Sequence, residues 1–164
     1  MNSKQPVVDL VQYNRWANTV LLDLIARAPA DGLDVIQPGM YASVREILAH
    51  LTGVERNFLR AIRGQSIERL RERSIDELQP MLRSLGPEFL TVLDGERDLK
   101  RPVHIPWLDG GVDIPLSDAV LQAVTHSIQH RADIIGQLGR EGVQSPTMDY
   151  VRWVLNGRPA VSGP

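Results

Sequence analysis

The helical spacing of apolar residues constrains the fold of this chain more than any other feature of its sequence. Through most of the 164 residues, apolar side chains recur at the period that gives an amphipathic helix one buried face. Strand-like alternation is confined to residues 101–115. The pattern predicts an all-α fold, a four-helix bundle with a short β-hairpin before the fourth helix and a short C-terminal helix.

Start and stop signals give the predicted helices their bounds. Pro6 suits the first turn of a helix that is expected to run to about Arg27. Ser43 and Ser74 each stand three residues before a glutamate, which predicts a capping box at the start of the second and of the third helix. The second helix is expected to end at Gly64, behind two arginines that suit the negative end of its dipole.

Two regions depart from regular helical patterning. In the third helix, Pro80 and the Gly86–Pro87 pair predict a kink or a break, because each proline removes an amide donor and crowds the preceding turn. Between residues 101 and 115, extended residues flank the turn sequence Asp-Gly-Gly at 109–111. This arrangement predicts the hairpin, with its prolines limiting the pairing of the strands.

The chain after the hairpin is expected to be helical again. Ser117 is expected to cap a fourth helix that continues to Gly142, and residues 148–157 predict a last short helix. No internal repeat or interdomain linker is visible, and the length is that of one ordinary domain. The sequence therefore predicts a single domain over residues 1–164.

The composition excludes several classes of protein and site. There is no cysteine, which rules out disulfides, Cys-ligated zinc, iron–sulfur clusters and cysteine nucleophiles, so a metal would need His, Asp or Glu ligands. The net charge of −2 and the pI near 6.1 argue against a nucleic acid partner. No stretch approaches the roughly 20 apolar residues of a membrane span, and no signal peptide is visible. We expect a cytoplasmic protein without a membrane partner.

A pair of histidines on the predicted fourth helix is the first candidate for chemistry. His126 and His130 are four residues apart, which displaces them by only about 40° around a helix and about 6 Å along it. Both rings can therefore bind one cation through metal–nitrogen bonds of about 2.0–2.1 Å. The pair lies at the rim of the apolar face. Two ordinary helix residues are the simpler interpretation of the same spacing.

A third histidine could complete the site. His50 falls at one edge of the apolar stripe of the second helix, and a packed bundle could bring that edge against the pair. Three neutral imidazoles and a divalent cation leave a net charge of +2 and an open coordination position, as in catalytic sites. Such ligands suit Zn, Ni, Fe or Cu. His104, in the hairpin, is expected to be a partly exposed strand residue.

The surroundings of the histidines offer candidates for outer contacts and exclude one enzyme class. Ser127 follows His126, so the H-E-x-x-H motif of zinc peptidases is absent. Glu46 and Asp133 lie within one helical turn of a candidate ligand and could orient its imidazole. The simpler interpretation gives Glu46 to the capping box and Asp133 to the surface.

Several motifs together carry a resemblance to a known family. They are the Tyr-x2-Trp-Ala-Asn segment at 13–18, the histidine in residues 43–59, the His-x3-His-Arg motif at 126–131 and the terminal Asp-Tyr at 149–150. With these motifs the sequence resembles, nearly end to end, the DinB-like (YfiT-like) family of small metal-binding four-helix proteins. It departs from the usual family pattern at residues 129, 132 and 133, where it has Gln, Ala and Asp.

The resemblance implies a divalent metal, with Zn, Ni or Fe expected, held by His50, His126 and His130. Members with these ligands include S-transferases and isomerases that use bacillithiol, mycothiol or glutathione, and hydrolases. The resemblance thus implies a small-molecule substrate and, for the thiol-dependent members, a low-molecular-weight thiol as cofactor. Relatives are often homodimers, although no patch in this sequence indicates an interface. Arg131 follows the family pattern and could fix the helix or bind a substrate anion.

Three functions are compatible with these features. The first is a metal-dependent enzyme that activates a thiol or water, of the thiol S-transferase, isomerase or hydrolase type. Its substrate is expected in a cleft between the first, second and fourth helices, where Tyr13, Trp16 and Trp107 could line it or simply pack in the core. The second is a non-catalytic metal-binding or stress-associated bundle protein. The third is a helical interaction module without a metal.

Overall fold

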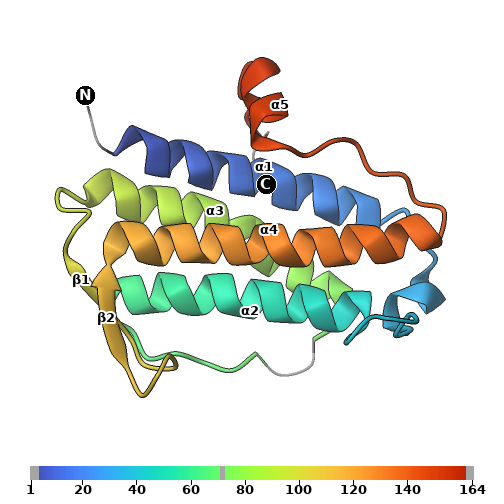
Figure 1. Ribbon diagram of the computed structural model, residues 1–164, viewed down its shortest axis with the longest axis horizontal. Helices are drawn as coiled ribbons and strands as arrows, with labels where there is room; N and C mark the ends of the chain where they lie inside the picture. The colour runs from blue at the N-terminus through green and yellow to red at the C-terminus, as the bar shows by residue number, and fades with distance from the viewer. Residues whose placement is uncertain (1–3, 71–72, 162–164) are drawn as a thin grey trace.

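Long helices lie side by side along most of the molecule, and a short helix stands over one of them (Figure 1). The computed structural model describes residues 4–70 and 73–161. Within this part of the chain the predicted all-α bundle, hairpin and short last helix are all present. The elements in chain order are α1 (Gln5–Ile25), the 3-10 helix η1 (Ala30–Asp34), α2 (Val44–Ile62), α3 (Ile75–Gly95), β1 (Pro102–Ile105), β2 (Val112–Pro115), α4 (Leu116–Arg140) and α5 (Tyr150–Leu155).

The four long helices form a closed ring of contacts. α1 packs against α3 and α4, and α2 packs against the same two helices. In Figure 1, α2 and α4 are neighbours that run in opposite directions, whereas α2 and α3 run in the same direction. The chain between α2 and α3 therefore returns along the bundle, where the Leu70 side chain lies 3.3 Å from the position that a Cβ of Gly53 would occupy.

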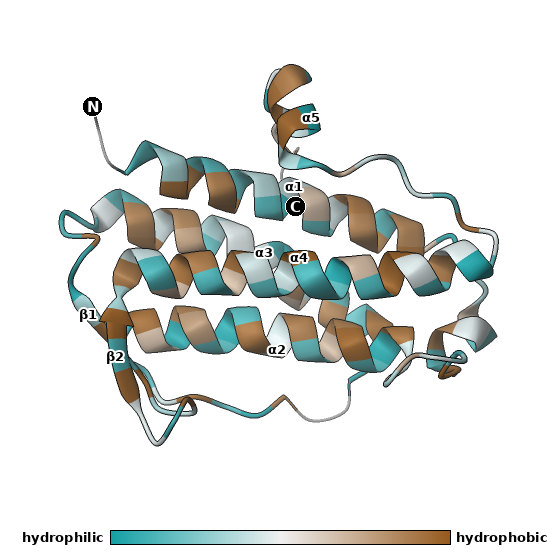
Figure 2. Ribbon diagram, in the orientation of Figure 1, coloured by the Kyte–Doolittle hydropathy of each residue, from teal (hydrophilic) through white to brown (hydrophobic). Residues whose placement is uncertain are grey.

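One apolar face of each long helix is buried in a common core. Leu21, Leu48, Leu82 and Leu138, one from each helix, are all at most 2% exposed. Figure 2 shows hydrophobic residues recurring along each helix between hydrophilic ones. Burial of a leucine side chain stabilises a fold by roughly 1.5–3 kcal/mol, so these faces account for the bundle.

Both predicted capping boxes are confirmed. The Ser43 hydroxyl accepts the Glu46 amide at 3.3 Å, and the Glu46 carboxylate accepts the Ser43 amide at 2.8 Å. Ser74 and Glu77 repeat this arrangement at the start of α3. The reciprocal bonds satisfy amides that have no partner within the helix, which explains why α2 and α3 begin where they do.

The start of α4 corrects one prediction. Ser117 is not its N-cap: β2 continues directly into the helix, which begins at Leu116 with Pro115 in the capping position and no side-chain cap. The Ser117 amide is instead bound by the Leu99 carbonyl at 2.9 Å. The helix ends at Arg140, close to the predicted end at Gly142. Gly142 has a positive φ of 83°, a conformation that commonly terminates helices.

Of the kink or break predicted for α3, the break is wrong, because the helix is continuous through Pro80 and Pro87. Both prolines are exposed, so the carbonyls that lose an amide partner can bind water. Gly86 is buried, and the Arg15 side chain lies 2.8 Å from where its Cβ would be. The glycine therefore serves the close approach of α1 to α3 and does not end the helix.

The predicted hairpin is confirmed. β1 and β2 pair antiparallel with Val103 opposite Ile114 and His104 opposite Asp113. The His104 ring is exposed, as expected, and its Nδ1 lies 2.8 Å from Asp113 Oδ1. His104 belongs to the hairpin at one end of the bundle (Figure 1) and is not part of the group formed by the other three histidines.

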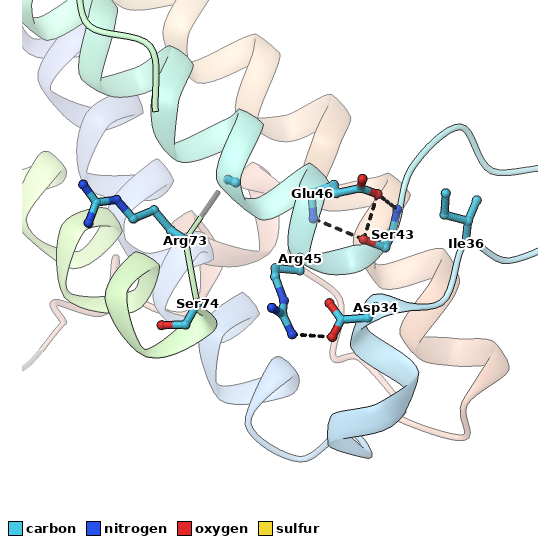
Figure 3. A pocket seen from close by; sticks show the side chains of 8 residues that line it. Asp34, Ile36, Ser43, Arg45, Glu46, Arg73 and Ser74 are labelled. Carbon is cyan, nitrogen blue, oxygen red and sulfur yellow. Dashed lines mark hydrogen bonds and ion pairs between the residues drawn. The ribbon is translucent and has the colours of Figure 1, made fainter. Parts of the chain in front are cut away.

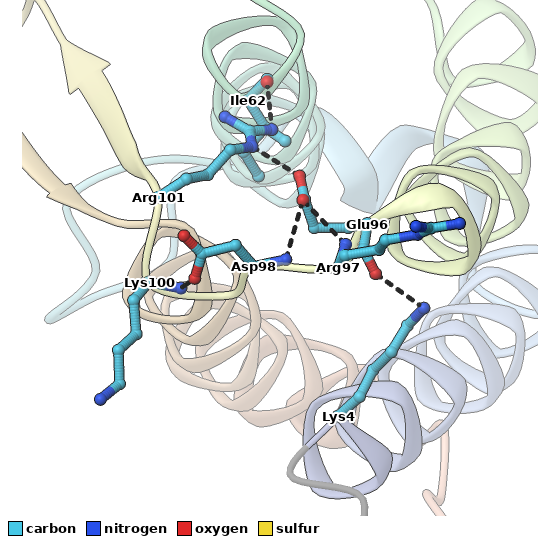
Figure 4. Close-up of polar contacts among 7 residues, drawn as sticks. All are labelled: Lys4, Ile62, Glu96, Arg97, Asp98, Lys100 and Arg101. Carbon is cyan, nitrogen blue, oxygen red and sulfur yellow. Dashed lines mark hydrogen bonds and ion pairs between the residues drawn. The ribbon is translucent and has the colours of Figure 1, made fainter.

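Glu96 ties the end of α3 to the hairpin and to α2 (Figure 4). Its carboxylate accepts the Arg101 guanidinium at 2.5 Å and the backbone amides of Arg97 and Asp98. The Arg101 side chain lowers the pKa of Glu96, with the two amides acting in the same direction. Arg101 also donates to the Ile62 carbonyl at 2.9 Å, at the last residue of α2. These contacts fix the hairpin against the end of the bundle.

In the part of the chain that the structure describes, none of the helices combines the length and the apolar character that a membrane crossing requires.

We predict that Ser43→Ala lowers the free energy of unfolding by about 1 kcal/mol, because the Glu46 amide loses its acceptor. Urea denaturation followed by circular dichroism measures this change. Ser66→Ala, which removes an exposed serine hydroxyl from a loop, is the matched control and should leave the free energy unchanged. Equal values for both variants would show that the box does not stabilise α2.

Candidate metal centre

The structure brings three histidines together. His126 Nε2 lies 3.1 Å from His50 Nε2 and 3.1 Å from His130 Nε2. One ligand atom from each ring lies within 4.8 Å of the others. The three rings come from two helices, because His50 belongs to α2 and the pair belongs to α4. The three histidines that the sequence analysis predicted as metal ligands therefore lie together in the structure.

The cluster lies at the seam where α2 and α4 pack against each other. These helices are antiparallel neighbours, so an edge residue of one can meet an edge residue of the other. Burial rises across the cluster: His50 is exposed, His126 is partly buried and His130 is buried. The centre is consequently open to solvent on the side of His50.

The donors fit a divalent cation. Tetrahedral coordination with metal–nitrogen bonds of 2.0–2.1 Å separates neighbouring nitrogens by about 3.3 Å. The two observed separations of 3.1 Å are close to this value, and all three ligand atoms lie within 4.8 Å of one another. Among the described residues the group consists of imidazoles alone, with no carboxylate. Three neutral ligands leave a fourth position for water, a thiol or another small molecule.

Tyr41 and Asp133 orient the ring of His130. The His130 Nδ1 atom lies 2.8 Å from the Tyr41 hydroxyl and 3.2 Å from Asp133 Oδ2. The Tyr41 hydroxyl donates to the same carboxylate oxygen at 3.1 Å. Two oxygens can thus accept the Nδ1 proton, which leaves the Nε2 lone pair directed at the cluster. This is the contact pattern usual for metal-binding histidines.

One of these partners was predicted and the other was missed. Asp133 takes the orienting role that its spacing suggested. Glu46 does not: it is engaged by Ser43 in the capping box, and the Ser43 amide lowers its pKa. Tyr41 lies in the irregular segment between η1 and α2, where no periodicity indicates which way a side chain points. Only its position two residues before an N-cap hints that it lies near α2.

The environment favours the neutral form of two of the imidazoles, those of His50 and His126. Burial lowers the pKa of His126 to about 4, and the neighbouring charges of His130 and His50 act in the same direction. Burial, with the charge of His130, also lowers the pKa of His50. A metal requires the unprotonated ring, so both shifts favour metal binding at neutral pH. Burial and Asp133 raise the pKa of Tyr41 to about 12, so this side chain stays a phenol.

Three aromatic residues proposed as cleft-lining are used in packing. The Tyr13 hydroxyl donates to the Met148 carbonyl at 2.7 Å, and the buried Tyr13 ring packs edge-on against Trp153 of α5. Trp16 lies beside Tyr13 with ring centroids 6.1 Å apart. Trp107 packs edge-on against Phe58. These contacts anchor α5 and the hairpin to the bundle.

Arg131 has a structural role. It is 3% exposed, and its guanidinium donates to Asn14 and Asn18 of α1 at 2.5 and 2.6 Å. Burial lowers the pKa of this guanidinium, and the charge of Glu55 opposes that effect. Of the two roles considered for Arg131, fixing the helix is the one that the contacts support.

A pocket of about 450 Å³ lies between η1, the start of α2 and the start of α3 (Figure 3). Its wall includes Glu46 and Ala49, and Ala49 directly precedes His50 in the chain. Asp34 and Arg45 form an ion pair in the pocket. The pocket faces η1 and the start of α3, and not the side of α1 where the substrate was expected.

We predict that Tyr41→Phe weakens metal affinity about tenfold, because His130 loses one of the groups that orient it. Competitive titration against a chromogenic chelator measures the affinity. Tyr150→Phe, which removes a hydroxyl on α5, is the matched control and should bind metal as the wild type does. Unchanged affinity in Tyr41→Phe would show that Asp133 alone orients the ring.

A second prediction concerns the metal-free protein in acid. The unfolded chain binds a proton at His126 near the ordinary pKa of 6.5, whereas the folded chain does so only near pH 4. The unfolded state thus holds more protons in this window, so stability should fall as the pH is lowered from 6.5 to about 4. His126→Gln should lose part of this dependence. Urea titrations across the window, with chelator present, test both expectations, and identical slopes would refute the assignment.

Comparison with known proteins places the chain in a family. The model of the DinB family matches residues 1–156. A solved DinB-like protein from Bacillus subtilis, YjoA, has a similar fold, with a TM-score of 0.61 at 14% sequence identity over 85% of this chain and 97% of that chain. No curated protein matches the sequence. Because the family match extends from α1 through α5 and includes His50, His126 and His130, the chain belongs to the DinB family.

Proposed function

We propose that this protein is a metal-dependent enzyme that activates a thiol or a water molecule, of the thiol S-transferase, isomerase or hydrolase type. The observation that carries the proposal is the convergence of the Nε2 atoms of His50, His126 and His130, with two separations of 3.1 Å, on the solvent side of a helix seam. Zn, Ni or Fe suits these ligands. A low-molecular-weight thiol is the proposed cofactor for the transferase or isomerase reactions.

A divalent cation, when bound, lowers the pKa of a coordinated water or thiol and so supplies a nucleophile near neutral pH. The protein contributes the geometry. Tyr41 and Asp133 hold His130, and the exposed position of His50 leaves the approach to the centre open. Ser127, at the position where zinc peptidases have a glutamate, donates to Glu55 at 2.5 Å and provides no general base.

The pocket beside α2 supports a small-molecule substrate. Its volume of about 450 Å³ is in the range of ligand sites, and it adjoins the turn of α2 that presents His50. Location in the cytoplasm and assembly as a homodimer stay predictions from the sequence and the resemblance.

One observation favours the alternative, a non-catalytic protein that stores or senses a metal. Among the described residues the cluster holds no carboxylate, so a general acid or base is not part of it. Proton transfer would then depend on the substrate or the solvent. The two functions share the same metal site and differ only in turnover.

Metal binding is tested by elemental analysis of the purified protein. We expect bound Zn, Ni or Fe in the wild type and a loss to background in His126→Ala and His130→Ala, because each removes a ligand. His104→Ala, in the hairpin, is the control and should keep the metal. Equal, negligible metal in all proteins would exclude the site and favour an interaction module.

Catalysis is tested with metal-loaded and metal-free samples. Thiol-transfer assays with bacillithiol, mycothiol and glutathione, together with a hydrolysis panel, should show turnover that depends on the metal. Turnover should be lost in His126→Ala. The same background in both samples on every substrate class would favour storage or sensing over catalysis.

A further inference from the structure

A buried polar network lies directly behind the histidine cluster. It connects α1, α2 and α4, and it uses none of the groups that face the cluster. We call it the Glu55 network. Its members, all at most 5% exposed, are Asn14, Asn18, Glu55, Ser127 and Arg131.

Glu55 of α2 is the acceptor at the centre of this network. Its Oε1 atom accepts the Asn14 amide at 2.8 Å, the Asn18 amide at 2.9 Å and the Ser127 hydroxyl at 2.5 Å. The two asparagines use their oxygens to accept the Arg131 guanidinium. The two asparagine amides thus link Glu55 to Nη1 of Arg131, whereas Arg131 Nη2 has no hydrogen-bond partner among the described residues.

The network holds the same two helices that carry the histidines. Ser127 and Arg131 directly follow His126 and His130, so each ligand on α4 has a network member beside it in the chain. Glu55 follows His50 by five residues, which is about 7.5 Å along the axis of α2. The Ser127–Glu55 bond therefore crosses from α4 to α2 close to the cluster.

A metal centre needs this alignment to be tight. Metal–ligand distances have to lie within about 0.2 Å of their ideal values, whereas sliding one helix by a single residue moves a ligand by about 1.5 Å. Apolar contacts between α2 and α4 are not directional and tolerate repacking. Buried hydrogen bonds and charges are directional, and breaking them leaves a polar group without a partner.

We propose that Glu55 and Ser127 are positioning residues for the metal centre. Their hydrogen bond sets the height and rotation of α4 against α2, and so holds the three histidines ready before a cation arrives. This inference rests on the proposed metal site and goes beyond it, because it assigns the geometry of the ligands to residues that touch neither the metal nor the substrate. The Ser127–Glu55 contact at 2.5 Å is its main support.

Cobalt(II) is the probe, because its visible spectrum reports coordination geometry. We expect Ser127→Ala to weaken Co²⁺ binding by about threefold to tenfold, the size of effects transmitted through packed side chains. Its ligand-field bands should also shift in position or intensity. Ser127→Thr keeps the hydroxyl and should recover the wild-type spectrum.

A matched control separates positioning from general stability. Thr52 of α2 is fully buried like Ser127, and each hydroxyl lies within 3.0 Å of the carbonyl four residues earlier in its own helix. Only the Ser127 hydroxyl also bonds to another helix, through Glu55. Thr52→Val removes a buried hydroxyl without breaking a bond between helices. We expect wild-type Co²⁺ affinity and spectrum for this variant, even if its unfolding midpoint falls.

The outcomes distinguish this inference from the proposed metal site. Wild-type affinity and spectrum in folded Ser127→Ala would overturn the positioning role while leaving the metal site intact. A wild-type protein that binds no Co²⁺ would overturn the metal site and the positioning role with it. Should Ser127→Ala fail to fold, Glu55→Met, which keeps the length of the side chain and removes the acceptor, replaces it under the same criteria.

Discussion

The packing of α2 against α4 is the contact on which the rest of this structure depends. On one edge of this seam the helices bring His50 to His126 and His130, and behind it Glu55 accepts the hydroxyl of Ser127. The apolar core supplies most of the attraction between the helices, but this attraction is not directional. The hydrogen bond from Ser127 to Glu55 is directional and lies beside the ligands, so it can set the relative height of the two helices. The seam thus combines apolar packing, which is strong but not directional, with a hydrogen bond, which is weaker but directional.

The electrostatics of the seam differ on its two sides. Behind the cluster, the charges of Glu55 and Arg131 are joined through asparagines, so neither is buried without partners. At the cluster, burial lowers the pKa values of His50 and His126, which favours the neutral form of these two rings. Neutral rings in contact cost little to assemble, whereas three imidazolium ions would repel one another. Unprotonated imidazoles avoid mutual repulsion in the metal-free protein, and they are also the form that binds a cation.

The parts of this architecture that could be predicted are those set by local sequence. The capping boxes at Ser43 and Ser74 depend on residues three apart, and His126 and His130 share a face because of helix geometry alone. The break at Pro80 was wrong because exposure, which decides whether a freed carbonyl finds water, depends on packing. Tyr41 was missed because it lies in an irregular segment. Glu55 was also missed, although an acidic residue on the apolar face of a helix could have indicated a buried polar contact.

The distribution of burial over the cluster bears on what the protein does. Structural metal sites are closed by four protein ligands, whereas catalytic sites keep a position for an exchangeable molecule. Here His130 is buried and held by Tyr41 and Asp133, but His50 is exposed at the edge of the seam. The inner ligands would retain a cation while the outer side admits a substrate. An open side of this kind is what the exchange of a bound molecule requires, so the asymmetry fits a centre with an exchangeable fourth ligand better than a closed structural site.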